Sequence, residues 1–238
     1  CSVLMDVFWL NIDGEEVLLY RCIYAPVKSN MFIMVNGKEA IVIDPNDNEE
    51  GILLLQGKNV ENVHLILTHE HFDHTLGVPK IQEKFPQNDL FCQEEAGRSI
   101  SSKKGNNPML IAFVLAEQDR TDGGDRYKDF KSSYRPYVLH ADEIFGESAH
   151  REICGLRFHF IHTPGHSGGS SCVELGHYVF SGDSLLKEER TILRFPEGEK
   201  EKYENITLPY LRGLGKETII IPGHGDPFRI TESKFLWD

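Results

Sequence analysis

The sequence predicts an α/β protein in which two β-sheets pack against each other and helices cover their outer faces. Strand patterns precede mixed strand and helix patterns in both halves of the chain, and two packed sheets are an economical way to bury such elements. Between residues 39 and 92 the order strand, helix, strand, helix, strand leaves room for right-handed crossovers. The length of 238 residues suits a single domain over residues 1–238.

The first third of the chain is expected to form consecutive strands, because β-branched and aromatic residues gather there. The expected strands cover residues 7–12, 16–24, 31–35 and 40–43. Asp13-Gly14 and Asn36-Gly37 predict hairpin turns between successive pairs of strands. The run Asp44-Pro45-Asn46-Asp47 then ends the sheet pattern and can cap a short helix that reaches Leu55.

Later elements follow from periodicity and from turn residues. We expect a strand over 64–67, a helix over 75–85, strands over 152–162, 171–175 and 178–181, a polar helix over 201–211 and a buried strand over 218–221. Between about 94 and 137, breakers at Gly105-Asn106-Asn107-Pro108 and Thr121-Asp122-Gly123-Gly124 flank an expected helix over 109–117. This segment is too short for a core of its own, so it is interpreted as a partly helical insertion.

Composition narrows the class of partner. The formal net charge of −12, with 37 acidic and 25 basic side chains, makes nucleic acid an unexpected partner and a small-molecule substrate the expected one. No apolar run approaches the ~20 residues that a membrane span needs. The five cysteines are scattered and form no C-x-x-C pair, which favours reduced thiols and a cytoplasmic location. The sequence does not predict the oligomeric state.

The strongest chemical signal is the run Thr-His-Glu-His-Phe-Asp-His at residues 68–74. It directly follows the apolar strand over 64–67 and opens the helical segment. His69, His71, Asp73 and His74 are four metal-ligand side chains within six positions, at a strand-to-helix turn where they can converge. Histidine mixed with carboxylate, without cysteine, favours zinc, iron or manganese and disfavours a purely structural thiolate site.

Three further segments repeat the order strand, glycine-lined loop, ligand. Residues 163–169 present His166, residues 180–184 present Asp183, and residues 221–225 present His224. Glycine beside each ligand permits unusual backbone angles and a close approach to a metal ion. All four loops are expected at the same edge of the sheets, where binding residues usually gather.

The ordered set His-x-His-x-Asp-His, Pro-Gly-His, Gly-Asp and Pro-Gly-His-Gly resembles the pattern of the metallo-β-lactamase superfamily. Within it, the chain is most similar to glyoxalase II-like (hydroxyacylglutathione hydrolase-like) enzymes. The resemblance covers roughly residues 29–227 and fills every ligand position in order. It implies an αββα sandwich of two mixed β-sheets flanked by helices, with the site at the edge that the two sheets share.

The resemblance also implies two divalent metal ions, with zinc favoured over iron and manganese. Seven side chains would hold them: His69, His71 and His166 the first ion, Asp73, His74 and His224 the second, and Asp183 both. Two ions ~3.5–4 Å apart can share one water and convert it to hydroxide at neutral pH. Asp73 is then expected to orient this bridging hydroxide and to pass a proton to the leaving atom.

We therefore expect a binuclear metallohydrolase that cleaves an ester-type bond, a thioester or a lactone, in a small molecule. The alternatives are an iron-dependent sulfur dioxygenase-like enzyme and a phosphodiesterase or nuclease of the same superfamily. A β-lactamase is disfavoured because Asp183 supplies a bridging carboxylate, and a non-enzymatic scaffold is disfavoured because no ligand is lost. Only fourteen residues follow His224, so we expect no C-terminal glutathione-binding helical region.

Several other residues have an open or structural interpretation. Lys187, Arg190 and Arg194 follow Asp183 closely, and substrate contact and a solvated charged face are equally compatible with them. Aromatic side chains of the insertion are expected to form its core rather than a lid over the site: Tyr127, Phe130, Tyr134 and Tyr137. The remaining histidines are expected to be structural or exposed: His64, His140, His150, His159, His162 and His177.

Overall fold

The computed structural model describes residues 5–102, 109–133, 135–195 and 197–237, and it contains two β-sheets. The first sheet has seven strands in sequence order: β1 (Met5–Ile12), β2 (Glu15–Tyr24), β3 (Ser29–Asn36), β4 (Glu39–Ile43), β5 (Asn62–Ile66), β6 (Gln87–Gln93) and β7 (Glu143–Phe145). Strands β1 to β4 pair antiparallel, whereas β4 to β7 pair parallel, so the sheet is mixed.

The second sheet has six strands, again mixed. Their spatial order is β13 (Phe228–Arg229), β12 (Ile219–Pro222), β11 (Tyr178–Gly182), β10 (Ser171–Leu175), β9 (Leu156–His162) and β8 (Ser148–Ile153). Only β11 and β12 pair parallel. The carboxyl ends of these two strands therefore meet at one edge of the sheet, and this edge carries two of the predicted ligands.

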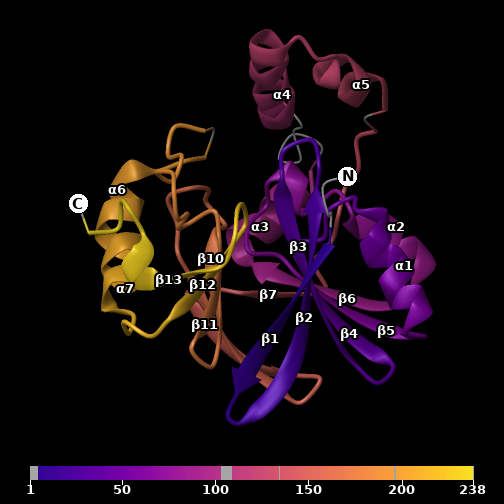
Figure 1. The fold of residues 1–238 in the computed structure, drawn as a ribbon, viewed down its shortest axis with the longest axis vertical. Helices are drawn as coiled ribbons and strands as arrows, with labels where there is room; N and C mark the ends of the chain where they lie inside the picture. Colours follow the sequence, from indigo (N-terminus) through magenta and orange to yellow (C-terminus); the bar gives the residue numbers. More distant parts are fainter. Residues whose placement is uncertain (1–4, 103–108, 134, 196, 238) are drawn as a thin grey trace.

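Helices cover the outer face of each sheet (Figure 1). The first sheet is covered by α1 (Glu49–Gly57), α2 (Val78–Lys84) and α3 (Glu94–Ile100). The second is covered by α6 (Lys200–Lys202), a π-helical segment (Tyr203–Thr207) and α7 (Leu208–Gly213). Helices α4 (Met109–Asp122) and α5 (Arg126–Ser133) stand apart from both sheets, at the top of Figure 1.

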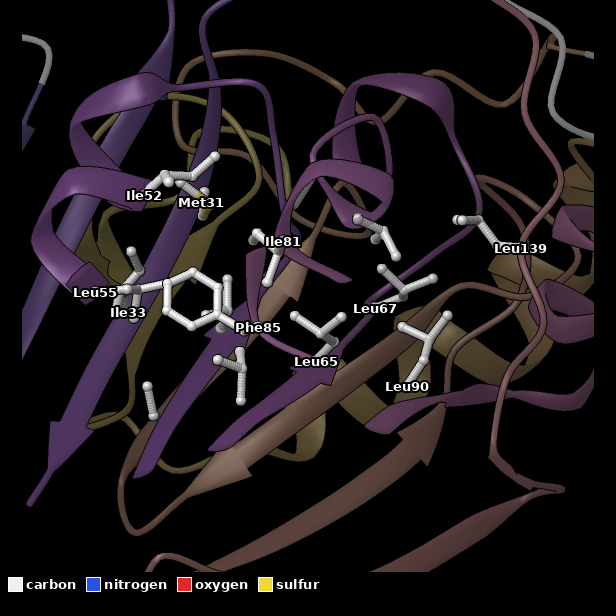
Figure 2. Packing of buried hydrophobic residues seen from close by; sticks show 14 of the residues in the cluster. Met31, Ile33, Ile52, Leu55, Leu65, Leu67, Ile81, Phe85, Leu90 and Leu139 are labelled. Atoms are coloured by element: carbon white, nitrogen blue, oxygen red, sulfur yellow. The ribbon is translucent and has the colours of Figure 1, made fainter. Parts of the chain in front are cut away.

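Alternating side chains of the strands build two separate apolar layers. In β3, Met31 and Ile33 pack under α1, whereas Phe32 and Met34 point into the space between the sheets. Successive strand residues face opposite sides, so one strand serves both layers. Figure 2 shows the layer between the first sheet and its helices. Helix, sheet, sheet, helix is the layer order, which confirms the predicted αββα sandwich.

Three sequence-based boundaries were wrong. The strand expected over 152–162 is a hairpin, because Cys154 (φ 53°) and Gly155 (φ 78°) adopt left-handed conformations and reverse the chain between β8 and β9. The single helix expected over 201–211 is divided by the π-helical segment. In addition, α4 runs to Asp122 rather than to residue 117, and Gly123, at φ 76°, follows its end.

The range 94–137 contains two kinds of structure. Its first helix, α3, contributes Ala96 and Ile100 to the core of the first sheet. Helices α4 and α5 instead share a small apolar cluster with the loop that follows β5, in which Phe130 packs against Phe72 with ring centroids 5.7 Å apart. Tyr134 and the breaker at 105–108 lie outside the described residues. Within the described ranges, no helix is both long enough and apolar enough to cross a membrane.

Candidate metal centre

All seven predicted ligands come together at one edge of the sandwich, on the loops that follow four different strands. The loop after β5 carries His69, His71, Asp73 and His74, and the loops after β9, β11 and β12 carry His166, Asp183 and His224. Both sheets thus contribute ligands to the same place. The backbone N–H of Ser171 donates to the carbonyl of Thr68 at 2.7 Å and joins the sheets beside the site.

The first group consists of His69, His71 and His166, and one ring nitrogen of each lies within 4.8 Å of those of the other two. Nε2 of His166 is 2.9 Å from Nδ1 of His71. The ring of His69 lies against both, with centroid distances of 4.7 Å to His71 and 5.0 Å to His166. Three imidazoles facing one point form a donor set that suits zinc or a similar ion.

The second group consists of Asp73, His74 and His224. Oδ2 of Asp73 lies 3.4 Å from Nε2 of His74 and 3.3 Å from Nε2 of His224. Asp183 stands between the two groups. Its Oδ2 is 3.5 Å from Nε2 of both His166 and His224, and its Oδ1 is 3.7 Å from Nε2 of His74. One carboxylate therefore reaches both groups.

Three donor atoms at this site are buried and have no hydrogen-bond partner: Nε2 of His69, Nε2 of His74 and Oδ1 of Asp183. Buried polar atoms are otherwise almost always paired, because an unpaired one costs about 1–3 kcal/mol. Metal ions would satisfy all three atoms. Imidazole and carboxylate donors are also the ligand types that zinc, iron and manganese accept, so the residues fit a binuclear centre.

The opposite nitrogens of the imidazoles are held by the protein. Nδ1 of His74 is 3.1 Å from Oδ2 of Asp44, and Nδ1 of His166 is 2.9 Å from the carbonyl oxygen of Ile192. Nδ1 of His69 is 3.0 Å from Oγ1 of Thr68, which donates to Oδ2 of Asp44 at 2.7 Å. Such contacts leave the Nε2 atoms to face a metal ion.

Asp44 was missed as a functional residue by the sequence reasoning, which treated it only as a turn former. Its side chain is close enough to His69 and His74 to form a third possible ligand group. However, its two oxygens already accept hydrogen bonds from the backbone N–H and the hydroxyl of Thr68, and Oδ2 also contacts His74. We therefore assign Asp44 to the support of the ligands. The available signal was an acidic residue directly after a buried strand.

Burial and neighbouring charges shift the pKa values of the ligands in opposite directions. Burial, with the surrounding histidines, lowers the pKa of His69 and lowers that of His71 to about 3. Burial also opposes the charged form of His74, but Asp73, Asp183 and Asp44 outweigh it and raise the pKa of His74 to about 10. The first group is thus held neutral, as metal binding requires, whereas a proton must leave the second group before a metal ion binds there.

Two glycines let the loops approach each other. Gly182 has φ 48°, and a Cβ atom there would lie 2.3 Å from Oγ1 of Thr68. A Cβ atom on Gly223 would lie 2.3 Å from Oδ1 of Asp183 and 2.8 Å from Cε1 of His74. Only a residue without a side chain fits between these ligands, which gives a physical reason for the glycine in each motif.

A cavity of about 670 Å³ opens onto the two ligand groups. Its apolar lining comes from several loops and from α4: Val27, Phe72, Ile111, Val114, Leu186, Ile192 and Phe195. Its polar lining includes Lys28, Gln118 and Lys187, besides the ligand side chains and three further acidic residues, Glu188, Glu189 and Asp226. A volume of this size is in the range of small-molecule sites, roughly 300–1,000 Å³.

The cationic and aromatic residues left open by the sequence are now placed. Lys187 lines the cavity and pairs with Glu232 at 2.7 Å, whereas Arg190 lies over the ring of Phe235. Arg194 is exposed.

Tyr137 packs on Phe72, and its hydroxyl is 2.9 Å from Oγ1 of Thr75, so it supports the loop that carries the predicted ligands.

The other histidines contact neighbours away from the cavity. Nδ1 of His64 is 2.6 Å from Oδ1 of Asp89, and Nδ1 of His159 is 2.8 Å from Oε2 of Glu174. The ring of His150 stacks on that of His159 with centroids 4.1 Å apart. Nε2 of His162 is 2.9 Å from the carbonyl oxygen of Gly168. Among the described residues, none of these histidines joins a possible metal-ligand group.

Comparison with known proteins agrees with this geometry. The family model of the metallo-beta-lactamase superfamily matches residues 24–224. A probable metallo-hydrolase of Streptococcus pyogenes serotype M6 is 26% identical over 232 residues, which cover 96% of this chain and 91% of that protein. Hydroxyacylglutathione hydrolase 1 of Vibrio vulnificus is 40% identical over 129 residues, but these cover only 50% of this chain and 49% of that protein.

Solved structures share the fold at low sequence identity. The BLEG-1 B3 metallo-beta-lactamase is 24% identical with a TM-score of 0.68, over 92% of this chain and 99% of that one. TTHA1623 in a di-iron-bound form is 22% identical with a TM-score of 0.65, over 91% and 97%. ETHE1 from Myxococcus xanthus is 16% identical with a TM-score of 0.61, over 91% and 81%.

Proposed function

The chain belongs to the metallo-β-lactamase superfamily, and from this membership and its ligand geometry we propose that it is a binuclear metallohydrolase that cleaves an ester-type bond in a small molecule. A thioester or a lactone is the proposed substrate. The observation that carries the proposal is the convergence of seven ligand side chains, three of them with buried atoms that lack any other partner, at a cavity of about 670 Å³.

His69, His71 and His166 would hold one ion, Asp73, His74 and His224 the other, and Asp183 both. When bound, two divalent ions supply Lewis acidity, which lowers the pKa of water and polarises a carbonyl oxygen. Zinc is the proposed metal, because three imidazoles with nearby carboxylates suit it. The remaining steps can be assigned to side chains of this chain.

Asp73 is the proposed proton carrier. Its Oδ2 faces His74 and His224, and its carboxylate also lines the cavity, where a substrate can reach it. Burial would raise the pKa of Asp73, but His74 and His224 hold it below its usual value, so the group starts as a carboxylate. As a carboxylate, Asp73 can orient the attacking water and accept its proton. It can then pass this proton to the departing sulfur or oxygen atom.

The cavity wall favours a substrate with an apolar acyl part. Val27, Phe72, Ile111 and Val114 form an apolar side that includes α4, and burial of a methylene group there stabilises binding by roughly 0.8 kcal/mol. The likeness to a hydroxyacylglutathione hydrolase supports thioester chemistry, although it covers only half of each chain. A glutathione thioester is therefore one substrate to test among several.

An iron-dependent oxygen reaction is the second candidate. The specific observations that favour it are the likeness in fold to TTHA1623, which binds two iron ions, and to ETHE1 from Myxococcus xanthus. Iron and zinc accept the same imidazole and carboxylate donors, so the ligand set is compatible with either metal. Phosphodiester hydrolysis is a weaker candidate, because the net charge of −12 opposes a polyanionic substrate.

The test is elemental analysis of protein purified without added metal, together with turnover of a panel of lactones and thioesters. About two zinc ions per chain with ester-type turnover would support the binuclear hydrolase. One iron ion per chain, no hydrolysis, and oxygen uptake on addition of a thiol persulfide would overturn it in favour of the iron enzyme. Absence of metal, even after metal is added, would contradict both candidates.

A further inference from the structure

The first ligand group is assembled from two loops that belong to different sheets. His69 and His71 follow β5 in the first sheet, whereas His166 follows β9 in the second. Nε2 of His166 and Nδ1 of His71 are only 2.9 Å apart, so both loops must be held at a fixed separation. A displacement of about 1 Å in either loop would place one imidazole outside the metal–nitrogen distance of roughly 2.0–2.1 Å.

Glu70 lies between His69 and His71 in the sequence. Its side chain spans the distance between their loop and the loop that carries His166. It is only 2% exposed. Oε2 accepts a hydrogen bond from the hydroxyl of Ser167 at 2.9 Å, and Oε1 accepts one from the backbone N–H of Gly169 at 3.3 Å. Ser167 immediately follows His166. The carboxylate therefore connects the loop of His69 and His71 to the loop of His166.

The loop that Glu70 reaches is fixed on its other sides as well. Oγ of Ser170 lies 2.8 Å from Oγ of Ser167 and accepts the backbone N–H of Ser167 at 3.1 Å. Gly169 packs so closely on α3 that an added Cβ atom would lie 2.3 Å from the backbone nitrogen of Ala96. The loop is thus held between α3 and the Glu70 carboxylate, with His166 beside these contacts.

Packing alone does not explain a carboxylate at this position. Among the residues that the structure describes, no lysine, arginine or histidine forms an ion pair with Glu70. A buried carboxylate without a cationic partner is costly, and an apolar side chain of similar size would avoid that cost. The ion that the neighbouring histidines would hold offers the missing positive charge. The presence of a carboxylate at position 70 is therefore explained by the proposed metal centre.

We propose that Glu70 is a positioning residue for the first metal ion, because its two hydrogen bonds set the distance between His71 and His166. The inference rests on the proposed binuclear centre but does not depend on the substrate. Glu70 is not among the residues that line the cavity, and its side-chain hydrogen bonds go to Ser167 and Gly169 in the loop that carries His166, a ligand of the first group.

The test is a titration of the metal-free full-length chain with cobalt(II), read from its visible absorption. To isolate the first ion, each variant is compared in a His224→Ala background, which removes a ligand of the second group. Glu70→Ala should weaken cobalt binding by about 10- to 100-fold and change the absorption spectrum. Glu70→Gln keeps an acceptor for Ser167, so it should recover most of the affinity lost in the alanine variant.

Ser167→Ala is the second variant, for the case in which Glu70→Ala does not fold. It removes the bond to Oε2 and the contact with Oγ of Ser170 but keeps the bond from Gly169 to Oε1, so it should weaken cobalt binding in the same direction by a smaller factor. Tyr178→Phe is the matched control, because it removes a buried hydroxyl that accepts the N–H of Asn11 at the opposite end of the sandwich. It should lower the melting temperature without changing cobalt affinity or spectrum.

The outcomes separate this inference from the proposed function. If the unmodified chain binds no cobalt, the proposed metal centre fails. If it binds cobalt, and the Glu70 and Ser167 variants bind it equally well with unchanged spectra, only the positioning role is overturned. A loss of thermal stability alone would equally overturn it, because that result describes a structural residue without influence on the ligands.

Discussion

Oδ2 of Asp44 lies 3.1 Å from Nδ1 of His74 and also accepts the hydroxyl of Thr68, which contacts Nδ1 of His69. One buried carboxylate thereby fixes the orientation of two imidazoles from opposite ligand groups. Asp44 is 1% exposed and has φ 54°, a left-handed conformation in which non-glycine residues are uncommon. Its position at the end of β4 places it directly beneath the site.

Asp44→Asn should weaken metal binding and turnover by about 10- to 100-fold, a range typical for residues that orient metal ligands. The asparagine amide keeps the shape but offers one acceptor oxygen in place of two, so one of the bonds from Thr68 or His74 must be lost. Competition with a metal chelator measures the affinity. Unchanged affinity for both ions would contradict the supporting role of Asp44.

Asp183→Asn should release at least one metal ion and abolish hydrolysis while the fold survives. The reason is that Oδ2 of Asp183 is 3.5 Å from ligands of both groups, and an amide nitrogen cannot replace a carboxylate oxygen there. Elemental analysis and circular dichroism on the same sample report metal content and fold. A variant that keeps two ions and full turnover would show that Asp183 is not a bridging ligand.

Much of the ligand set could be predicted from the sequence because its motifs are local. His69 to His74 lie within six positions, and each remaining ligand follows a strand and stands beside a glycine. Strand ends at one edge of a sandwich bring such loops together without any detailed knowledge of packing. Asp44 and Glu70 were different. Asp44 meets Thr68 and His74 only through the pairing of β4 with β5, and Glu70 meets Ser167 only when the two sheets pack together.

The secondary structure that the sequence did not predict has two physical explanations. Residues 152–162 carry a nearly continuous β pattern, and only the left-handed conformations of Cys154 and Gly155 reveal the hairpin. Cysteine gives no turn signal in a sequence, unlike the Asp13-Gly14 turn that was predicted. The path of α4 and α5 was equally unreadable, because the apolar cluster of Ile111, Leu115 and Phe130 also includes Phe72 of the ligand loop.

Gly223→Ala should reduce metal content and activity without unfolding the chain. An added Cβ atom would lie 2.3 Å from Oδ1 of Asp183, so the carboxylate must move away from its position between the ligand groups. Overpacking of this kind typically costs about 1–3 kcal/mol of stability. Elemental analysis and denaturant unfolding measure the two effects.

Gly57→Ala is the matched control for this substitution. Gly57 ends α1, and a Cβ atom there meets nothing within 4 Å. The control should keep its metal and be neutral or slightly more stable, by about 0.4–1 kcal/mol. Equal metal loss in both variants would mean that the close approach at Gly223 is unimportant to the site.

The last prediction concerns His64 on β5, whose Nδ1 is 2.6 Å from Oδ1 of Asp89 on the neighbouring strand β6. The hydrogen bond that His64 donates to Asp89, with a smaller contribution from Cys154, raises the pKa of His64 from 6.5 to about 10. A pKa that is higher in the folded state means that folding favours the protonated imidazole. The resulting stabilisation is fully present below pH 6.5 and disappears as the pH rises through about 10.

Asp89→Asn should return the pKa of His64 toward 6.5, because the amide cannot stabilise the imidazolium as a carboxylate does. The difference in unfolding free energy between wild type and variant should therefore be largest below pH 6.5 and should vanish above about pH 10. Urea unfolding at one pH in each range measures it. A difference that stays constant with pH would show that Asp89 stabilises the sheet by packing and not through the charge of His64.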